Sequence, residues 1–193
     1  MKVYLISDLH LGHRNIIRGG RIGIRPFDTL DAMHERIIDG WNSVVKPHDK
    51  IYMLGDLTLE RPKRNEVGHF WDWLMAICAR LEGRKRLLLG NHDHLSPSMY
   101  QLLGFEKVLA YQKLADCIVS HIPVHPSQFM RFVGNIHGHT HDKHVLATVP
   151  SALVSCGEFA PVYDRRYLNV SVESLNYVPI SLDDAVATLR RRS

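Results

Sequence analysis

The amino-acid sequence predicts an α/β fold, and three observations lead to this prediction. The first half alternates short apolar runs with longer stretches whose apolar residues recur at helical spacing. The second half changes to short β-rich runs with few helical stretches. Metal-competent side chains directly follow several predicted strands, which is where open α/β sheets collect their ligands. We therefore expect a β-α-β-α-β first half, a mainly β second half and a site formed by loops.

The first half contains three predicted strands and two predicted helices. Residues 2–7, 50–54 and 86–89 are short apolar runs bounded by polar residues, as buried strands are. The stretches between them predict helices, because their apolar residues fall on one helical face, and Gly83 ends the second helix. The two faces consist of Met33, Ile37, Ile38, Trp41 and Val45, and of Val67, Phe70, Trp71, Leu74, Cys78 and Leu81.

The second half is predicted to consist mainly of strands, with a short helix at its end. Residues 181–184, Ser-Leu-Asp-Asp, have the form of a capping box, and Val186 and Leu189 follow on one helical face. Arginines occupy the last turn, where the helix dipole favours cations. The expected strands are residues 107–113, 116–120, 132–136, 152–155 and 167–172.

The composition indicates one globular domain over residues 1–193. The hydrophobic fraction is 45% and the charged fraction 23%, and no run approaches the roughly 20 apolar residues that a membrane span requires. The N-terminal apolar run is too short for a signal-peptide core. The three cysteines are odd in number, so we expect no disulfide framework and a cytoplasmic location. The net charge of +4 favours anionic ligands.

The positions of several of the thirteen histidines indicate a metal site. In extended backbone, residues two apart point the same way, so both members of an Asp-x-His or His-x-His pair can bind one ion. Glycines stand beside three of the groups, where the backbone must turn sharply. The metal-competent residues that follow predicted strands are Asp8 with His10, Asp56, Asn91 with His92, His121, and His139 with His141.

The order of these motifs resembles that of the calcineurin-like metallophosphoesterase superfamily. Asp-x-His, Gly-Asp, Gly-Asn-His-Asp, a single His and Gly-His-x-His follow one another between residues 8 and 141. The resemblance implies a four-layer α-β-β-α sandwich of two mixed sheets flanked by helices. It also implies a hydrolase with two divalent metal ions, and a ligand set of nitrogen and oxygen suits Mn, Fe, Zn, Co or Ni.

The resemblance further implies a role for each motif residue. Asp56 would bridge the two ions, and a bridging hydroxide would be the nucleophile. His92 would protonate the leaving oxygen as the general acid, while Asp93 would orient the ring of His92. The first ion would be held by Asp8, His10, Asp56 and His141, and the second by Asp56, Asn91, His121 and His139.

A basic segment after the first motif predicts contacts with substrate. Between His10 and Pro26 there are four arginines and no acidic residue. His13, Arg14 and Arg25 are the candidate substrate-binding residues, because the arginine fork fits phosphate oxygens and a glycine-containing loop could close over the site. A solvated basic loop is the alternative for the arginines other than Arg14. The segment also resembles a small bacterial and phage-type branch of the superfamily.

Other polar residues are interpreted as structural. His34 and His69 lie on predicted helices, where solvated or packed roles are more usual than metal binding. For His137 we favour a supporting or core role over direct chemistry. Asn169 and Glu173 are interpreted as ordinary strand and turn residues.

Three functions are compatible with the motifs. A phosphodiesterase acting on a small nucleotide-type substrate is the first hypothesis, and a phosphomonoesterase with the same site is the second. A metal-binding scaffold without turnover is the third, and retention of His92 and of all the metal ligands argues against it. Protein Ser/Thr phosphatases continue Gly-Asp to Asp-Arg-Gly, whereas Leu57 follows Asp56 here. A phosphoprotein substrate is therefore not expected. The chain is also too short for the capping domains of related DNA-repair nucleases, so we do not expect a large duplex substrate. We expect a small phosphate ester as substrate and no membrane partner.

Overall fold

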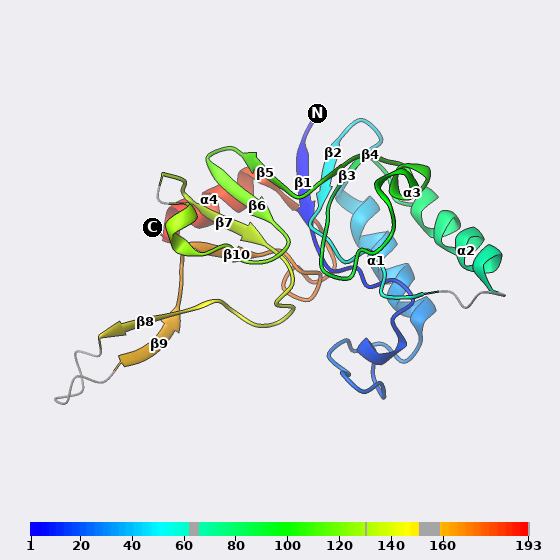
Figure 1. Cartoon of the computed structure of the whole chain (residues 1–193), viewed down its shortest axis with the longest axis horizontal. Coiled ribbons are helices and arrows are strands. Elements are labelled where there is room, and N and C mark those ends of the chain that lie inside the picture. The colour runs from blue at the N-terminus through cyan, green and yellow to red at the C-terminus, as the bar shows by residue number, and fades with distance from the viewer. Residues whose placement is uncertain (62–65, 130, 151–158, 193) are drawn as a thin grey trace.

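The structure is a computed structural model, and it describes residues 1–61, 66–129, 131–150 and 159–192. Figure 1 shows the arrangement of the elements along the chain. They are β1 (Val3–Ile6), η1 (Arg14–Ile16), α1 (Leu30–Val44), β2 (Lys50–Met53), α2 (Val67–Ala79), β3 (Arg84–Leu88), α3 (Pro97–Leu102), β4 (Phe105–Leu109), β5 (Tyr111–Leu114), β6 (Cys117–Ser120), η2 (Pro126–Gln128), β7 (Gly134–His137), β8 (Leu146–Pro150), β9 (Phe159–Tyr163), β10 (Tyr167–Asn169), β11 (Ile180–Ser181) and α4 (Leu182–Arg192).

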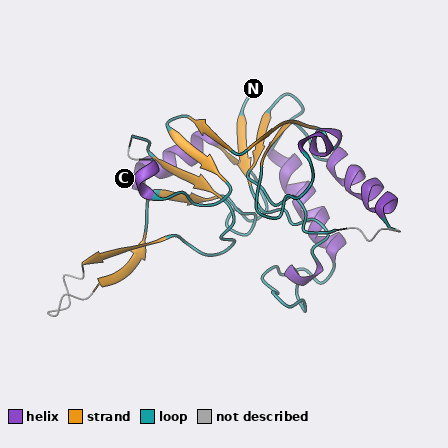
Figure 2. Ribbon diagram, in the orientation of Figure 1, coloured by secondary structure: helices purple, strands orange, loops and turns teal. Residues whose placement is uncertain are grey.

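Two mixed sheets form the centre of the molecule (Figure 2). The first has the strand order β11-β1-β2-β3-β4, in which β1 to β4 are parallel and β11 is antiparallel to β1. The second has the order β10-β7-β6-β5, in which only β5 is antiparallel to its neighbour. Strands β8 and β9 form a separate hairpin that extends away from both sheets in Figure 1. The predicted class, two mixed sheets flanked by helices, is confirmed.

Alternating side chains of the central strands are buried in two separate cores. In β1, Ile6 belongs to the core that includes Trp41 of α1, whereas its neighbour Leu5 belongs to the core that includes Val119 and Ile136 of the second sheet. This alternation follows from the two-residue repeat of a strand. The first core therefore lies between the first sheet and helices α1 and α2. The second lies between the two sheets and also includes Ala185, Val186 and Leu189 of α4. Burying each such side chain contributes about 1.5–3 kcal/mol.

Helices α1 and α4, both predicted from the sequence, begin with side-chain caps. Thr29 Oγ1 accepts a hydrogen bond from the backbone N–H of Ala32 at 3.1 Å and starts α1. In α4, Ser181 Oγ accepts from the backbone N–H of Asp184 at 3.1 Å and donates to Asp184 Oδ2 at 2.6 Å. A cap of this kind contributes about 1 kcal/mol. The predicted apolar face of α1 is buried through Met33, Ile37, Ile38 and Trp41.

Several strand predictions need correction. The run 107–113 is not one strand, because β4 and β5 are separated at Ala110 and belong to different sheets. Helix α3, strand β11 and the β8–β9 hairpin were not predicted. The predicted strand 152–155 lies outside the described residues, as does Cys156. Cys78 and Cys117 are buried free thiols, and burial raises the pKa of Cys78 to about 12 and that of Cys117 to about 11.

The two sheets meet where β1 and β10 end. The backbone N–H of Ser7 donates to Val170 O at 2.9 Å, and that of Val172 donates to Ser7 O at 3.1 Å. This pairing of Ser7 with Ser171 is parallel, so the carboxyl ends of strands from both sheets open onto one place. No helix of the described residues is long and apolar enough to cross a membrane.

Candidate metal centre

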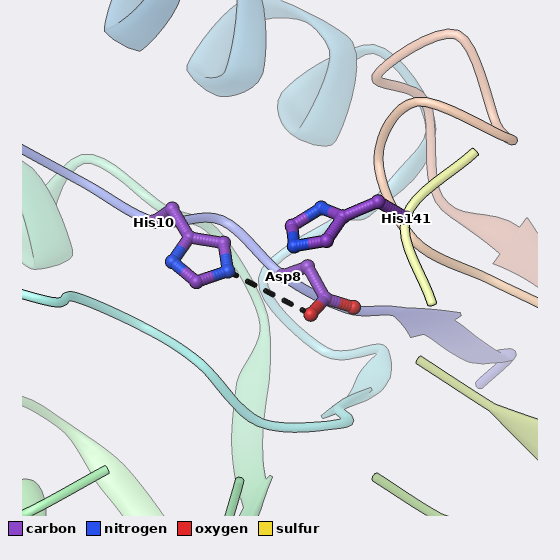
Figure 3. A group of neighbouring side chains, drawn as sticks. All are labelled: Asp8, His10 and His141. Carbon is purple, nitrogen blue, oxygen red and sulfur yellow. Dashed lines mark ion pairs between the residues drawn. The ribbon is translucent and has the colours of Figure 1, made fainter. Parts of the chain in front are cut away.

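All seven predicted metal ligands lie where the two sheets meet, on loops that follow β1, β2, β3, β6 and β7. Two groups each bring three ligand atoms within 4.8 Å of one another. Asp8, His10 and His141 form the first group, and Figure 3 shows these side chains with the ion pair between His10 and Asp8 dashed. The second group consists of Asp56, His121 and His139.

Asp56 lies between the two groups. Its Oδ2 is 3.5 Å from Nε2 of His10 in the first group and 3.4 Å from Nε2 of His121 in its own group. Its Oδ1 accepts a hydrogen bond from the backbone N–H of His92 at 3.0 Å. Because Asp56 is only 1% exposed, burying its negative charge is costly unless cations or hydrogen-bond donors lie beside it. This placement suits a carboxylate shared by two adjacent cations.

The environment of His121 also indicates a cation. Its Nδ1 lies 2.6 Å from Leu54 O, which can only accept, so Nδ1 carries the hydrogen. In the neutral ring, Nε2 then presents a lone pair, yet it lies 2.9 Å from Asn91 Oδ1 and 3.4 Å from Asp56 Oδ2. Three acceptors that face one space repel one another unless a positive charge, on the ring or as a metal ion, lies among them. Asn91 is thereby brought to the second group.

Ligand atoms of the first group are left unpaired by the protein. His10 is 2% exposed, and neither of its ring nitrogens has a hydrogen-bond partner among the described residues. Asp8 Oδ2 accepts hydrogen bonds at 2.9 Å from the backbone N–H of His139 and from Ser171 Oγ, whereas its Oδ1 has no such partner in the described part of the chain. An unpaired buried polar atom costs about 1–3 kcal/mol. Divalent metal ions fit these nitrogen and oxygen atoms and would remove that cost.

The charge state of Asp8 suits a metal ligand. Burial alone would raise the pKa of Asp8, but the neighbouring His10 and His121 rings outweigh burial and lower that pKa. Asp8 is therefore ionised at neutral pH. For His139, burial and the nearby His121 ring lower the pKa, so that its ring is neutral and can donate a lone pair to a metal ion.

Five of the seven candidate ligands adopt a left-handed backbone conformation. Their φ angles are 62° for Asp8, 48° for His10, 59° for Asp56, 68° for His139 and 53° for His141. Residues with a Cβ atom avoid this region, and each instance costs about 1–3 kcal/mol. Such strain persists only where the surrounding structure imposes it, and it collects at functional sites. The recurrence at these positions separates the centre from an ordinary surface cluster.

Two glycines allow the loops to approach the carboxylates. A Cβ atom at Gly90 would collide with Oδ1 of Asp56, and one at Gly138 would collide with the side chains of Ser7 and Asp8. Neither glycine has a positive φ angle, so space rather than a sharp turn requires glycine here.

Glu173 is a residue of the centre that sequence reasoning missed. It is not an ordinary turn residue, because its Oε1 accepts hydrogen bonds from Nδ1 of His141 at 3.1 Å and from Nε of Arg25 at 2.8 Å. Burial would raise the pKa of Glu173, but His141 and Arg25 outweigh burial and lower it. Glu173 directly follows the predicted strand 167–172, and this signal, which identified the other groups, would have identified Glu173 too.

The prediction that Arg25 contacts substrate is wrong. Arg25 is fully buried, and its guanidinium donates to Glu173 Oε1, to Leu9 O at 2.7 Å and to Asp8 O at 2.5 Å. These acceptors hold the backbone that carries Asp8. Arg25 therefore stabilises the backbone next to the metal centre and is not open to a substrate.

The prediction that Asp93 orients the ring of His92 is also wrong. Asp93 Oδ2 accepts from the backbone N–H groups of Asp56 and Gly90, both at 2.8 Å, and Oδ1 accepts from Leu57 N–H at 3.1 Å. The carboxylate thus fixes the loop that carries Asp56. Burial raises the pKa of Asp93, while the three N–H donors counteract this effect. The His92 ring is half-buried, and its centroid lies 5.7 Å from that of His10.

The other two candidate substrate contacts differ in position. His13 is buried beside the centre, with 5.5 Å between its ring centroid and that of His10. Burial, followed by the nearby His10, lowers the pKa of His13 to about 4, so its ring is neutral. Arg14 is exposed at the start of η1 and lines a surface pocket together with Glu60 and Trp73.

Comparisons with known proteins connect this geometry to a family. The model of the calcineurin-like phosphoesterase family matches residues 1–146, which include every candidate ligand. The uncharacterized protein MJ1445 of Methanocaldococcus jannaschii is 32% identical over 192 residues, covering 98% of this chain and 92% of that protein. The gene 66 protein of Mycobacterium phage L5 is 28% identical over 174 residues, covering 75% of this chain and 79% of that protein.

A solved structure has the same fold. The crystal structure of AQ665, a protein of unknown function from Aquifex aeolicus, matches with a TM-score of 0.61 and 25% identity, covering 95% of this chain and 96% of that one. Since the family match extends over three quarters of the chain and over both ligand groups, the chain belongs to the calcineurin-like phosphoesterase family and is a metal-dependent phosphoesterase.

Proposed function

We propose that the chain is a two-metal phosphodiesterase that acts on a small nucleotide-type substrate. The position of Asp56 carries this proposal, because its Oδ2 lies 3.5 Å from Nε2 of His10 and 3.4 Å from Nε2 of His121, so one carboxylate faces both ligand groups. When bound, two divalent ions activate water and neutralise charge on the phosphoryl group. Asp8, His10, Asp56 and His141 would hold one ion, and Asp56, Asn91, His121 and His139 the other.

The charge of the ligand set supports an anionic substrate. Asp8 and Asp56 are its two carboxylates, and the other five ligands are histidines and an asparagine. Two divalent ions exceed the charge of two carboxylates, so the loaded centre is positive and attracts a phosphate. Mn, Fe, Zn, Co and Ni all suit this ligand chemistry.

His92 is proposed as the general acid that protonates the leaving oxygen. Its backbone N–H is bonded to Asp56 Oδ1 at 3.0 Å, and its half-buried ring stands next to that of His10. The ring would therefore lie beside a phosphate bound at the two ligand groups, without being needed as a ligand. A positioned histidine of this kind contributes roughly 10²–10⁴-fold to the rate.

The burial of Arg25 supports a diester over a monoester. A monoester carries two negative charges near neutral pH, and bidentate arginines are suited to such a group. Arg25 donates to Glu173 Oε1, Leu9 O and Asp8 O, so its fork is not available to a phosphate. A diester carries one charge and has less need of this cation.

Hydrolysis of bis-p-nitrophenyl phosphate and of p-nitrophenyl phosphate, measured with Mn²⁺, tests the proposal. The diester is expected to react faster, and wild-type protein is expected to bind two metal ions per chain by elemental analysis. Asp56→Asn should abolish turnover and lower the metal content, whereas Asp28→Asn, which changes an exposed carboxylate, should preserve both. Faster reaction of the monoester would instead identify a phosphomonoesterase.

His92→Ala tests the general acid with two leaving groups. p-Nitrophenolate leaves readily without a proton, whereas the alkoxide of a dinucleotide needs one. The substitution should therefore slow dinucleotide hydrolysis more than that of bis-p-nitrophenyl phosphate. His69→Ala, at an exposed histidine of α2, is the matched control and should leave the ratio of the two rates unchanged. Equal slowing of both substrates by His92→Ala would remove the acid role from His92.

A further inference from the structure

A groove of about 590 Å³ lies next to the candidate metal centre. This volume is within the roughly 300–1,000 Å³ that small-molecule sites occupy. Strands β5 and β6 form one side of the groove, and described residues between β6 and β7, among them Val124, Gln128 and Phe132, form the other. Its lining includes Tyr111, Lys113, Ser120, His121, Arg131 and Phe132.

The groove is the outer face of the second sheet. In the β5–β6 ladder, Tyr111 pairs with Ser120 and Lys113 pairs with Ile118, so these four side chains share one face. Val119 points to the opposite face and is buried in the core between the sheets. Tyr111 remains 57% exposed, because the segment between β6 and β7 covers only part of this outer face. The floor is therefore built from regular strands and is preformed.

His121 connects the groove to the metal centre. Its ring belongs to the second ligand group, and the residue also borders the groove. The bond between its Nδ1 and Leu54 O fixes the ring in the second ligand group, next to the end of the groove. A phosphate at the centre would therefore direct one of its ester groups along the strands toward Tyr111 and Lys113.

The lining suits a ligand that has both a flat ring and a negatively charged group. Lys113 Nζ lies 5.6 Å and the guanidinium carbon of Arg131 5.9 Å from the centroid of the Phe132 ring. Among the described residues that line the groove, none is acidic. Exposed aromatic rings stack on nucleobases, and the two exposed cations attract a phosphate. A cyclic mononucleotide has no second phosphate for these cations, whereas a linear dinucleotide with a terminal phosphate, or a longer strand, has one.

We propose that the groove binds the nucleoside and second phosphate of a linear nucleotide diester, whose first phosphate is the one hydrolysed. The base would lie against Tyr111 or Phe132, and Lys113 and Arg131 would bind the phosphate beyond the sugar. This inference rests on the proposed function, because it places the reacting phosphate at the two ligand groups. It specifies the substrate class as dinucleotides that carry a terminal phosphate and the ends of short single strands.

Steady-state kinetics on dithymidine monophosphate, with and without a terminal phosphate at either end, tests the inference. Wild type should prefer at least one phosphorylated form. Lys113→Glu and Arg131→Glu should each lower kcat/KM for that form by roughly tenfold or more relative to the change for bis-p-nitrophenyl phosphate, because one charge-assisted contact is lost. Lys107→Glu, which makes the same change of charge on exposed β4, should preserve the preference. Comparing kcat/KM for the dinucleotide with kcat/KM for octathymidylate shows whether a dinucleotide or the end of a strand is the better substrate.

A binding measurement separates the groove from the catalytic proposal. A phosphorylated dithymidine analogue with a methylene group in place of the scissile ester oxygen should bind the Mn²⁺-loaded full chain in a calorimeter. Lys113→Glu should weaken this binding roughly tenfold. If wild type hydrolyses none of the esters but binds the analogue through Lys113, only the proposed catalysis fails. If the esters react but neither charge reversal changes the phosphate preference or the binding, the groove inference is overturned.

Discussion

Oε1 of Glu173 accepts a hydrogen bond from Nδ1 of His141 at 3.1 Å, which leaves Nε2 of this ring to face Asp8 and His10. A carboxylate behind a metal-binding histidine fixes the orientation of the ring and raises its basicity. The side chain of Glu173 is 8% exposed, and Arg25 on its other side balances the charge. Burial would lower the pKa of His141, but Glu173 outweighs burial and raises it.

Replacing Glu173 by glutamine should weaken metal binding. Glutamine has nearly the same shape but no negative charge, so His141 becomes a weaker ligand and the affinity should fall roughly 10–100-fold. Competition with a chromogenic chelator measures this change. Glu106→Gln is the matched control, since Glu106 pairs with Arg84 on the surface and should not affect the metal. An unchanged affinity in Glu173→Gln would show that Glu173 only stabilises the fold.

Much of the metal centre could be predicted because parallel strands share a carboxyl edge. Each candidate ligand follows a strand, so strand prediction together with the positions of aspartate and histidine predicts one shared site for residues as distant as Asp8 and His141. Their assignment to the same ion was implied by the resemblance to the superfamily. The two-residue alternation of Leu5 and Ile6 gives no local sign of which core each enters. That depends on the second sheet, which the resemblance implied and the residue pattern alone did not.

The remaining errors have tertiary causes. Arg25 lies in a basic, glycine-containing segment that resembles a solvated loop, and its burial depends on Glu173, which is 148 residues away. The chain passes from one sheet to the other at Ala110 without a glycine or proline to mark the break. Asp93 stands next to His92 in sequence, but its oxygens are taken by backbone N–H groups of another loop.

Asp93→Asn should mainly lower the stability of the fold, rather than act directly on the rate of turnover. The amide would turn an N–H donor toward N–H groups of Asp56, Gly90 or Leu57, so we expect a loss of about 3 kcal/mol or more in the free energy of unfolding. Urea unfolding measures this loss. Tyr100→Phe removes only the hydroxyl that donates to Asp93 Oδ1 at 3.1 Å, and should cost about 1 kcal/mol. Full stability with a lower kcat in Asp93→Asn would instead restore the role implied by the superfamily.

Gly138→Ala should damage the metal centre through steric overlap. The added Cβ atom would meet the side chains of Ser7 and Asp8 at the junction of the sheets, and overpacking of this kind costs about 1–3 kcal/mol. The metal content and the midpoint temperature of thermal unfolding should therefore both decrease. Gly68→Ala in α2 is the control, because no atom lies within 4 Å of its added Cβ. Alanine there should stabilise the helix by up to about 1 kcal/mol, and equal behaviour of the two variants would contradict the steric argument.

The stability of the fold should depend on the protonation of His34. The backbone N–H of Gly12 donates to His34 Nε2 at 3.0 Å, so this nitrogen must be unprotonated. Burial lowers the pKa of His34 below its ordinary value of 6.5, although Asp31 and Glu35 partly oppose the shift. The folded state therefore binds this proton less readily than the unfolded state. The contribution of His34 to stability is complete above pH 6.5 and is lost as the pH falls through the lower folded pKa.

His34→Leu removes both the acceptor and the titrating group. At about pH 8 the variant should be less stable than wild type by about 1–3 kcal/mol, because Gly12 N–H loses its partner. Below pH 6.5 this difference should shrink, since only wild type must bury or expel a proton at this position. Urea unfolding in the presence of EDTA, which removes any contribution from metal, measures both curves. His69→Leu, on the exposed face of α2, should leave the pH dependence of wild type unchanged. If the His34→Leu and wild-type curves stay parallel from about pH 8 to about pH 5, the bond to Gly12 is not the pH-sensitive contact that its geometry indicates.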